Sequence, residues 1–272
     1  MSFFSDISAI QNIVYIFSSI LFISGIKMLG KEDTAVRGNF LSASAMFIAV
    51  AVTIINVVNP VIVLIGVSIG AVIGSLIALR VKMTSIPEMV ALFNGFGGLA
   101  TFFIAWSEFN AIPDNVFQFI VIMLTTYIGG VTFSGSIIAY GKLSEKLKVK
   151  KDSFVTKIFT TFFYASILFL VYSIGFTEII ELPINFYTVL LILTLLGGIG
   201  FVIPIGGGDM PVVISLLNSF SGIAAAFAGL LLLNNVLIVA GSLVVASGLI
   251  LTIIMAKAMN RSIGNILFVG YA

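Results

Sequence analysis

PVIVLIGVSIGAVIGSLIAL, residues 60–79, is a stretch of twenty residues without a charged side chain. At 1.5 Å per residue, a helix of this length spans about 30 Å, which is the thickness of the hydrocarbon core of a bilayer. The rest of the 272-residue chain is similar, since 60% of its residues are hydrophobic, 9% are charged and the mean hydropathy is +1.24. Soluble domains carry about 25% charged residues. The composition therefore predicts an all-α integral membrane protein.

The apolar stretches predict a bundle of nine transmembrane helices that form one transmembrane domain over residues 1–272. These segments lie near residues 8–28, 39–58, 60–79, 86–107, 116–141, 157–175, 184–204, 210–232 and 236–257. We expect the first segment to remain in the mature protein. Asp6 rather than a basic cluster precedes its apolar run, and no small-residue cleavage pattern is evident.

The charged residues predict how the chain crosses the membrane. All thirteen Lys and Arg residues fall in alternate gaps between the apolar segments: Lys27, Lys31 and Arg37, then Arg80 and Lys82, then Lys142 through Lys157, then Lys257 and Arg261. The intervening gaps contain Glu108, Asp114, Glu178 and Glu181 and no cation. Because cytoplasmic loops retain positive charge, the amino terminus is predicted outside and the carboxyl terminus in the cytoplasm. Topology thus explains the basic residues, and we expect no nucleic acid partner.

The chain contains no cysteine and no histidine. Disulfides, thiolate chemistry and imidazole metal sites within this chain are therefore excluded, and we expect no bound metal. The run Gly206-Gly207-Gly208 is only a weak indication of nucleotide binding, because it lacks the strand, turn and helix that such a fingerprint requires.

Regularly spaced glycines predict where helices approach one another. Gly66, Gly70 and Gly74 recur every four residues and so line one face of a helix, which lets a neighbouring backbone come close. Similar seams occur in the fifth and seventh segments, at Gly129, Gly130, Gly135, Gly197, Gly198 and Gly200. Tight packing within the bundle is the simplest interpretation of these residues.

Two stretches of the chain repeat one another. PEMVALFNGFGGLA (87–100) aligns without gaps on PVVISLLNSFSGIA (211–224), at an offset of 124 residues. Both copies are predicted to open a helix from the cytoplasmic side, so we expect a parallel repeat of helices 4 and 5 in helices 8 and 9, related by a pseudo-twofold axis along the membrane normal. Ser134-Gly135 and Ser247-Gly248 extend the likeness at a different offset.

Each copy begins with a helix-start signal. Ser85 is predicted to cap the fourth helix, with Glu88 completing a capping box, and Asp209 is predicted to cap the eighth. A role for these acids at the mouth of a polar path is an equally open interpretation, since the two roles can coexist.

Asn94 and Asn218 each lie seven residues beyond the proline of their copy, about 10 Å into the membrane. A buried amide needs hydrogen-bond partners. Neighbouring helices could supply them, or the two amides could face each other across the pseudo-twofold axis and hold a file of water that carries protons. The residues alone leave both interpretations open.

The stretches VKMTSIPEMVALFNGFGGLA (81–100), GGGDMPVVISLLNSFSGIAAAFAG (206–229) and SGLILTIIMAKAMNRS (247–262) resemble the membrane part of the beta subunit of proton-translocating nicotinamide nucleotide transhydrogenase. The resemblance implies a bacterial cytoplasmic (inner) membrane protein, in which inward proton flow drives hydride transfer from NADH to NADP. It also implies the partners: an alpha subunit with an NAD(H)-binding domain and companion transmembrane helices, an NADP(H)-binding domain, and a dimer of the complex. NAD(H) and NADP(H) would bind to these partner domains, and this chain would bind no cofactor and catalyse no hydride transfer by itself.

The same resemblance implies roles for particular residues. Asn94 and Asn218 would line the proton path, Glu88 and Asp209 would lie toward its cytoplasmic end, and Ser247-Gly248 would help to gate it. Lys257 and Arg261 would lie where the membrane domain couples to the NADP(H)-binding domain.

Two departures from the family pattern matter. Many members have a histidine at the position of Asn94, and an amide cannot take up and release a proton near neutral pH. We therefore expect a companion subunit to contribute a histidine or carboxylate close to Asn94. The other departure is that no dinucleotide-binding sequence follows the last apolar segment, so we expect the NADP(H)-binding domain to be absent from this chain. The alternative function is a self-contained secondary transporter built on parallel repeats, although no charge falls at mid-membrane.

Overall fold

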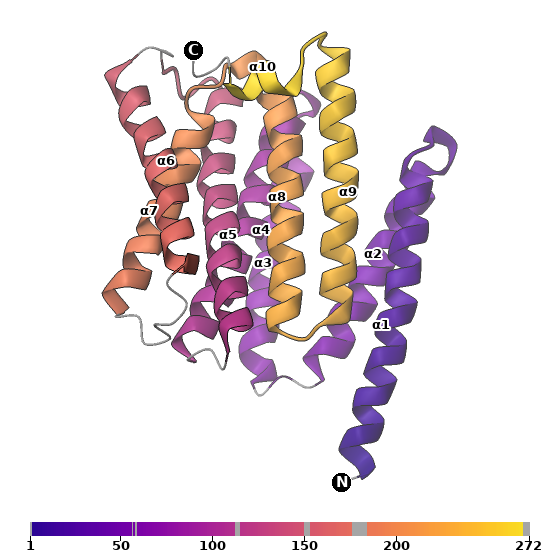
Figure 1. Cartoon of the computed structure of the whole chain (residues 1–272). Coiled ribbons are helices and arrows are strands. Elements are labelled where there is room, and N and C mark those ends of the chain that lie inside the picture. Colours follow the sequence, from indigo (N-terminus) through magenta and orange to yellow (C-terminus); the bar gives the residue numbers. More distant parts are fainter. Residues whose placement is uncertain are drawn as a thin grey trace. The chain divides into compact units, whose positions relative to one another are not determined.

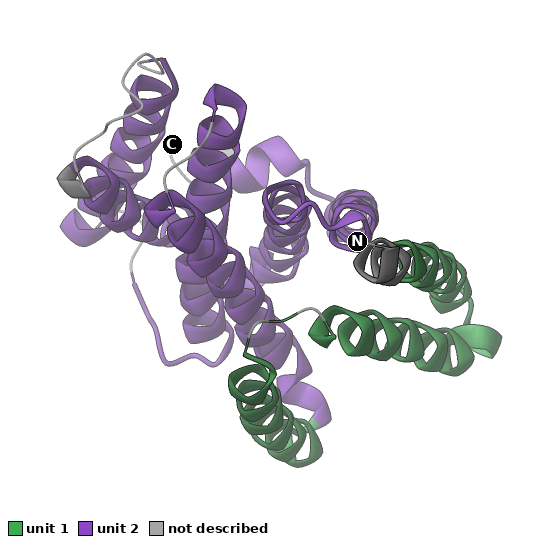
Figure 2. Ribbon diagram, turned by 90° about the horizontal axis from the view of Figure 1, so that it is seen from below, with its two compact units in different colours: residues 1–82 green, residues 83–272 purple. Residues whose placement is uncertain are grey.

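The fold was analysed in a computed structural model, which describes residues 2–55, 57, 59–111, 115–149, 153–175 and 184–268. Throughout these ranges the regular secondary structure is helical, which confirms the expected all-α class. Residues 1–82 and residues 83–272 form two compact units, which Figure 2 distinguishes by colour and which are described separately here.

The first unit contains α1 (Ser2–Leu29), α2 (Glu32–Ile54) and α3 (Pro60–Arg80). Helices α1 and α2 pack through two glycines: a Cβ atom at Gly25 would lie 2.9 Å from the Gly38 carbonyl oxygen, and one at Gly38 would lie 2.7 Å from that of Gly25. Gln11 adds a hydrogen bond of 3.0 Å to the Val52 carbonyl. A side chain larger than glycine at this crossing would separate the two helices.

Helix α3 behaves differently from the expectation for its glycines. None of its residues is buried, and no described atom lies within 4 Å of a Cβ built at Gly66, Gly70 or Gly74. The close neighbour predicted from the spacing is therefore not found among the described residues of its unit. Spacing reveals that a helix has a face of small residues, but it does not reveal which helix covers that face.

Within its described residues, the second unit contains six long helices and a short seventh. Figure 1 labels each of them. They are α4 (Ile86–Asn110), α5 (Val116–Leu143), α6 (Phe154–Gly175), α7 (Ile184–Val202), α8 (Met210–Leu231), α9 (Asn235–Ala258) and α10 (Ile263–Phe268). Short 3₁₀ turns precede α4 and α8, η1 at Met83–Ser85 and η2 at Gly207–Asp209. Helix α5 packs against α4, α7 and α8, so it lies at the centre of this unit.

Eight helices of the described chain are long and apolar enough to cross a membrane. The described apolar part of α7, Phe186–Val202, falls short of that length. These helices agree with an integral membrane protein. Three of the acidic residues used in the topology prediction, Asp114, Glu178 and Glu181, lie outside the described residues.

The glycines of α5 and α7 mark close helix contacts, as expected. A Cβ at Gly129 would lie 2.9 Å from the Gly98 carbonyl oxygen of α4, and one at Gly135 would lie 3.4 Å from that of Gly198. Gly130, Gly197 and Gly200 likewise face side-chain or backbone atoms of neighbouring helices. Small residues let these backbones approach within contact distance.

The predicted side-chain caps of α4 and α8 are wrong. Neither Ser85 nor Asp209 makes a capping hydrogen bond. Each ends a 3₁₀ turn with ψ near zero (6° and −4°), whereas a capping side chain needs the extended backbone that turns it toward the first free N–H groups. Pro87 and Pro211 do occupy the first turn of each helix, where their missing N–H costs no hydrogen bond.

Candidate functional site

Asn94 ties three helices of the second unit together. Its side-chain nitrogen on α4 donates a hydrogen bond of 3.0 Å to the Ser136 hydroxyl of α5, and its side-chain oxygen accepts one of 2.8 Å from the Ser221 hydroxyl of α8. Ser136 is 1% exposed. The amide thus finds its partners in neighbouring helices, which was one of the two interpretations left open by the sequence.

Asn218 occupies the matching position on α8, but its side chain lacks the hydrogen bonds to neighbouring helices that Asn94 makes. Its side chain makes no hydrogen bond to any described residue, and its nitrogen lies 3.3 Å from the position of a Cβ at Gly248. The side chain lines a cavity of about 360 Å³ between α4, α8 and α9. The cavity is bounded by Ile86, Pro87, Val90, Pro211, Ile214, Ser215, Asn218, Leu251 and Met255. It extends from the first turns of α4 and α8 toward the amide, and most of its wall is apolar.

Ser221 links the two asparagines. Its hydroxyl oxygen lies 2.8 Å from the Asn94 side-chain oxygen and 2.8 Å from the backbone carbonyl oxygen of Asn218. A hydroxyl has one proton to donate, so Ser221 serves one of these acceptors at a time. Ser221, which the sequence analysis did not select, therefore joins the Asn94 side chain to the backbone of Asn218 and not to its side-chain amide.

A second group of buried polar residues joins α8 to α9 beside Asn218. Ser215 donates 3.0 Å to the Gly248 carbonyl, and Thr252 lies 3.1 Å from the Ser215 hydroxyl and 2.8 Å from the same carbonyl. Ser215 is 4% exposed and Thr252 1%. Gly248 of the predicted path is thus at the centre of the α8–α9 contact. Ser247 is exposed and donates to the Val244 carbonyl of its own helix, so the structure separates the two members of the predicted Ser-Gly gate.

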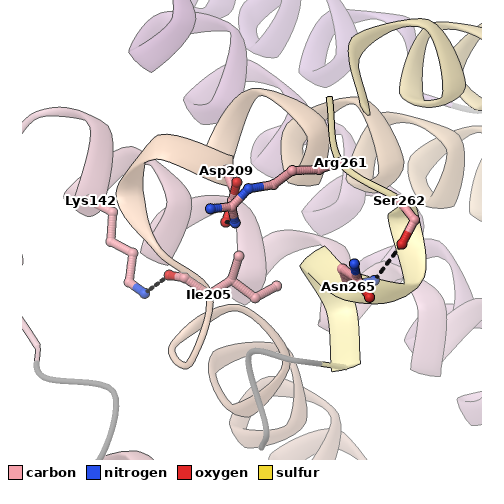
Figure 3. Close-up of polar contacts among 6 residues, drawn as sticks. All are labelled: Lys142, Ile205, Asp209, Arg261, Ser262 and Asn265. Carbon is pink, nitrogen blue, oxygen red and sulfur yellow. Dashed lines mark hydrogen bonds and ion pairs between the residues drawn. The ribbon is translucent and has the colours of Figure 1, made fainter. Parts of the chain in front are cut away.

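Asp209 and Arg261 meet at the end of the unit where α4 and α8 begin (Figure 3). The guanidinium nitrogen lies 2.8 Å from the carboxylate oxygen, and the two side chains are 55% and 14% exposed, respectively. The pair connects the residue that precedes α8 to the segment between α9 and α10. Lys257 is exposed one turn before Arg261, and Glu88 is half-buried in the first turn of α4.

Lys142 was predicted only as one of the cytoplasmic cations, yet it fixes the carboxyl end of α7 (Figure 3). Its ammonium donates to the carbonyl oxygens of Val202, Ile203 and Ile205. A lysine has three protons to donate, and a cation is favoured at the negative end of a helix dipole. Lys142 therefore holds the connection between α7 and the glycine turn that leads to Asp209.

The chemistry available to this site follows from its residue types. Within the described ranges, no group of three His, Cys, Asp or Glu residues comes together in a way that could hold a metal ion. Asn94, Asn218 and the serines around them donate and accept hydrogen bonds, but amides and hydroxyls do not titrate near neutral pH. The site can orient water or a partner's side chain, and a group that stores a proton must come from elsewhere.

The serines missed by the sequence analysis do carry a sequence signal. Comparison of the two repeated stretches pairs Gly95 with Ser219 and Gly97 with Ser221, and these are the polar differences closest to the shared asparagine. Ser136 has no such signal. Ser134, two residues earlier, bonds to its own helix at the Gly130 carbonyl, and only the structure separates the serine that faces the amide from the one that does not.

The sequence of this chain is similar to that of known proteins. Residues 11–272 match the family described as NAD(P) transhydrogenase beta subunit. Two relatives from Rhodospirillum rubrum, each named NAD(P) transhydrogenase subunit beta, are 36% identical to this chain over 269 residues. The matched region covers 94% of this chain and 57% of each relative, so the chain spans somewhat more than half the length of these relatives.

Proposed function

Because this chain belongs to the NAD(P) transhydrogenase beta-subunit family, we propose that it forms the proton-conducting membrane domain of such an enzyme. Inward movement of protons through this domain would be coupled to hydride transfer from NADH to NADP on partner domains. The partners are an alpha subunit with companion transmembrane helices and an NADP(H)-binding domain, assembled as a dimer of the complex in a bacterial cytoplasmic (inner) membrane. Family membership favours this function over a self-contained secondary transporter.

The observation that carries the proposal is the polar connection through the middle of the second unit. Asn94 bonds to Ser221 of α8, and Asn218 lies one turn earlier on the same helix, where it borders a cavity that leads toward the first turns of α4 and α8. Polar groups inside a membrane are costly unless they are bonded or functional. Water in the cavity would join the Asn218 amide to the hydrogen-bonded group around Asn94, and such a connection is what proton movement requires.

The proposed topology has nine crossings, with the amino terminus outside, the carboxyl terminus in the cytoplasm, and α4–α5 and α8–α9 as a parallel repeat. In the second unit, the basic residues Lys142, Lys257 and Arg261 occur at the helix ends where α4 and α8 begin, and Glu108 lies in the last turn of α4. This distribution supports a cytoplasmic location for the end that carries the Asp209–Arg261 pair.

The proton-storing group is assigned to a companion subunit. Asn94 uses both ends of its amide for hydrogen bonds to serines, and neither it nor those serines can titrate near neutral pH. A histidine or carboxylate of a companion helix close to Asn94 would supply this function. A complete complex without an ionisable side chain near that amide would contradict the assignment.

Coupling to the NADP(H)-binding domain is assigned to the cytoplasmic ion pair. Asp209 precedes the helix that carries Asn218, and Arg261 follows the helix that carries Gly248. A domain that binds Arg261 or Lys257 would therefore compete with Asp209 and act on both helices of the site. Glu88 lies in the equivalent first turn of α4, and Ser247 adjoins Gly248, so both belong to the proposed path by position.

The test is reconstitution of the chain with its partner subunits in liposomes, followed by measurement of proton uptake and of NADP reduction by NADH. We expect Asn94→Ala and Asn218→Ala each to reduce proton-coupled turnover while nucleotide binding to the partner domains is retained. Ser242→Ala is a matched control, because this exposed serine on α9 bonds only to the Ile238 carbonyl of its own helix. Wild-type turnover in both asparagine variants would overturn the proposal.

A further inference from the structure

The two helix pairs of the second unit make the same contact at equivalent residues. A Cβ at Gly98 would lie 2.9 Å from the Gly129 carbonyl oxygen and 2.9 Å from the Phe133 nitrogen, and one at Gly222 would lie 2.8 Å from the Gly241 oxygen and 2.8 Å from the Val245 nitrogen. The first helices are related by 124 residues, and these contacts relate the second helices by 112 residues, from Gly129 to Gly241.

This register corrects the pairing expected for the second helices. The likeness of Ser134-Gly135 to Ser247-Gly248 implies an offset of 113 residues between the second helices, one more than the 112 residues that the glycine contacts give. In the register of the contacts, Ser136 is the equivalent of Gly248. The glycine crossing decides the register because only one alignment brings both pairs of backbones into contact.

The environments of the two asparagines then differ at two positions. Asn94 bonds to Ser136 and Ser221, and the equivalents of these serines around Asn218 are Gly248 and Gly97. Neither glycine has a side chain to bond an amide, and a Cβ at Gly97 would meet no described atom within 4 Å. The two hydroxyls that hold Asn94 thus have no counterpart at Asn218.

Packing explains why serine and glycine exchange places across the helix pair. In the first pair Gly95 of α4 faces Ser136 of α5, where a Cβ at Gly95 would lie 3.1 Å from the Ser136 Cβ. In the second pair Ser219 of α8 faces Gly248 of α9, and a Cβ at Gly248 would collide with the Ser219 hydroxyl and lie 3.0 Å from its backbone nitrogen. Each pair has room for one serine at this level, on opposite helices in the two copies.

We infer that this exchange of serine and glycine fixes the amide of Asn94 and leaves the amide of Asn218 as the one that meets water at the cytoplasmic end of the path. The inference rests on the proposed function and divides its two asparagines between two roles. Asn94 is a positioning residue that joins α4, α5 and α8. Asn218 is the residue that hydrogen-bonds to the water of the cavity beside it.

The expected size of the difference follows from the hydrogen bonds. A neutral hydrogen bond favours the bonded arrangement by roughly fivefold, so the bond to Ser136 alone makes an unbonded Asn94 amide roughly fivefold rarer, and Ser221 adds to this whenever its one proton is directed at Asn94. Asn218 has no such competition from the described residues. An unbonded amide in a membrane needs a partner, and water in the cavity is the partner proposed here.

The first experiment measures access of water to the two positions. The chain has no cysteine, so Asn94→Cys and Asn218→Cys each give this chain a single thiol, whose labelling is read on this chain after the subunits of the reconstituted complex are separated. A membrane-impermeant methanethiosulfonate reagent added from the cytoplasmic side should modify position 218 about tenfold faster than position 94, because thiols react as thiolates, which form in water. Ser262→Cys, in the polar segment before α10, gives the reference rate. Equal rates at 94 and 218, or a faster rate at 94, would overturn the inference.

The second experiment transfers the first environment to the second copy. Ser219→Gly with Gly248→Ser reproduces the Gly95–Ser136 arrangement and supplies a hydroxyl to the Asn218 amide. Gly97→Ser places a serine at the position equivalent to Ser221, where a Cβ meets no described atom within 4 Å. Each change should reduce proton-coupled turnover by roughly fivefold, while Ser242→Ala leaves it unchanged.

The outcomes separate this inference from the proposed function. If Asn218→Ala turns over like the wild type, the proposed path itself fails. If Asn218→Ala is impaired but both serine transfers leave turnover unchanged, the path stands and the role given to the serine–glycine exchange is wrong. Because a Cβ at Gly97 meets no described atom of this chain within 4 Å, Gly97→Ser can be read even if the double variant does not fold.

Discussion

The crossing of α4 and α5 allows a test in which two adjacent glycines should respond in opposite directions. A Cβ at Gly98 would lie 2.9 Å from the Gly129 carbonyl oxygen, the Phe133 nitrogen and the Thr132 Cβ, whereas one at Gly97 would meet no described atom within 4 Å. Ordinary contact begins at 3.4 Å, so Gly98→Ala must move α5 away by roughly half an ångström. Two of the three obstructing atoms belong to the backbone, which cannot change rotamer to make room.

The magnitude follows from two opposing effects. Overpacking a close contact costs about 1–3 kcal/mol, and replacing glycine by alanine within a helix returns about 1 kcal/mol. Gly98→Ala should therefore destabilise the protein by about 1 kcal/mol, the middle of the resulting range of about 0–2 kcal/mol, which lowers the melting temperature by roughly 2–4 °C. Gly97→Ala experiences only the favourable effect and should leave the melting temperature unchanged or raise it slightly.

The assay is thermal unfolding of the purified protein in detergent, followed by the helical circular dichroism signal. Gly222→Ala provides an independent repetition, because its Cβ would lie 2.8 Å from the Gly241 oxygen and from the Val245 nitrogen. It should lower the melting temperature about as much as Gly98→Ala does. Shifts of the same sign and size for Gly97→Ala and Gly98→Ala would refute the crossing described here.

Three further substitutions test other contacts. Lys142→Met should destabilise the protein by about 2–3 kcal/mol because charged hydrogen bonds to three carbonyls are lost, while Lys146→Met, at an exposed lysine, should change the melting temperature little; equal effects would contradict the role given to Lys142. Arg261→Gln should lower the free energy of unfolding by less than about 1 kcal/mol, because the Arg261 side chain is 55% exposed and an ion pair of an exposed side chain contributes little. The same substitution should reduce coupled turnover in liposomes, and unchanged turnover would count against the coupling role. Tyr187→Phe removes a buried hydrogen bond of 2.7 Å and should cost about 1 kcal/mol in the same unfolding assay, so an unchanged melting temperature would contradict that bond.

The sequence was sufficient to predict the helical class and several helix contacts, because both depend on residue type alone. A chain this apolar has to satisfy its backbone within helices, and glycines such as Gly129 and Gly198 mark places where only a missing side chain allows contact. The partner of the α3 glycines could not be predicted in this way. A small-residue face defines what a helix can accept, and the covering helix depends on the arrangement of the whole assembly.

The predicted helix caps were wrong, and the serines that surround Asn94 were not predicted, for geometric reasons. Ser85 and Asp209 have suitable side chains, but the 3₁₀ turns before them give the backbone the wrong ψ for capping, and Asp209 binds Arg261 instead. Ser134 and Ser136 differ by two residues, or about 200° around the helix, so only one can face Asn94. Composition does not reveal which, because a serine inside a helix can always bond to its own backbone, as Ser134 does.

The duplicated helix pairs explain why so small a difference can divide the roles of the two asparagines. Asn94 and Asn218 each lie one turn before the glycine at which the helices cross, Gly98 and Gly222. So near the crossing, the facing positions admit only small residues without forcing the helices apart, since even the Gly95–Ser136 contact is already at 3.1 Å. Of the small residues found opposite the two amides, serine supplies a hydroxyl and glycine supplies no side chain. That choice determines whether the amide is bonded to the protein or open to water, and the helix packing stays the same in both cases.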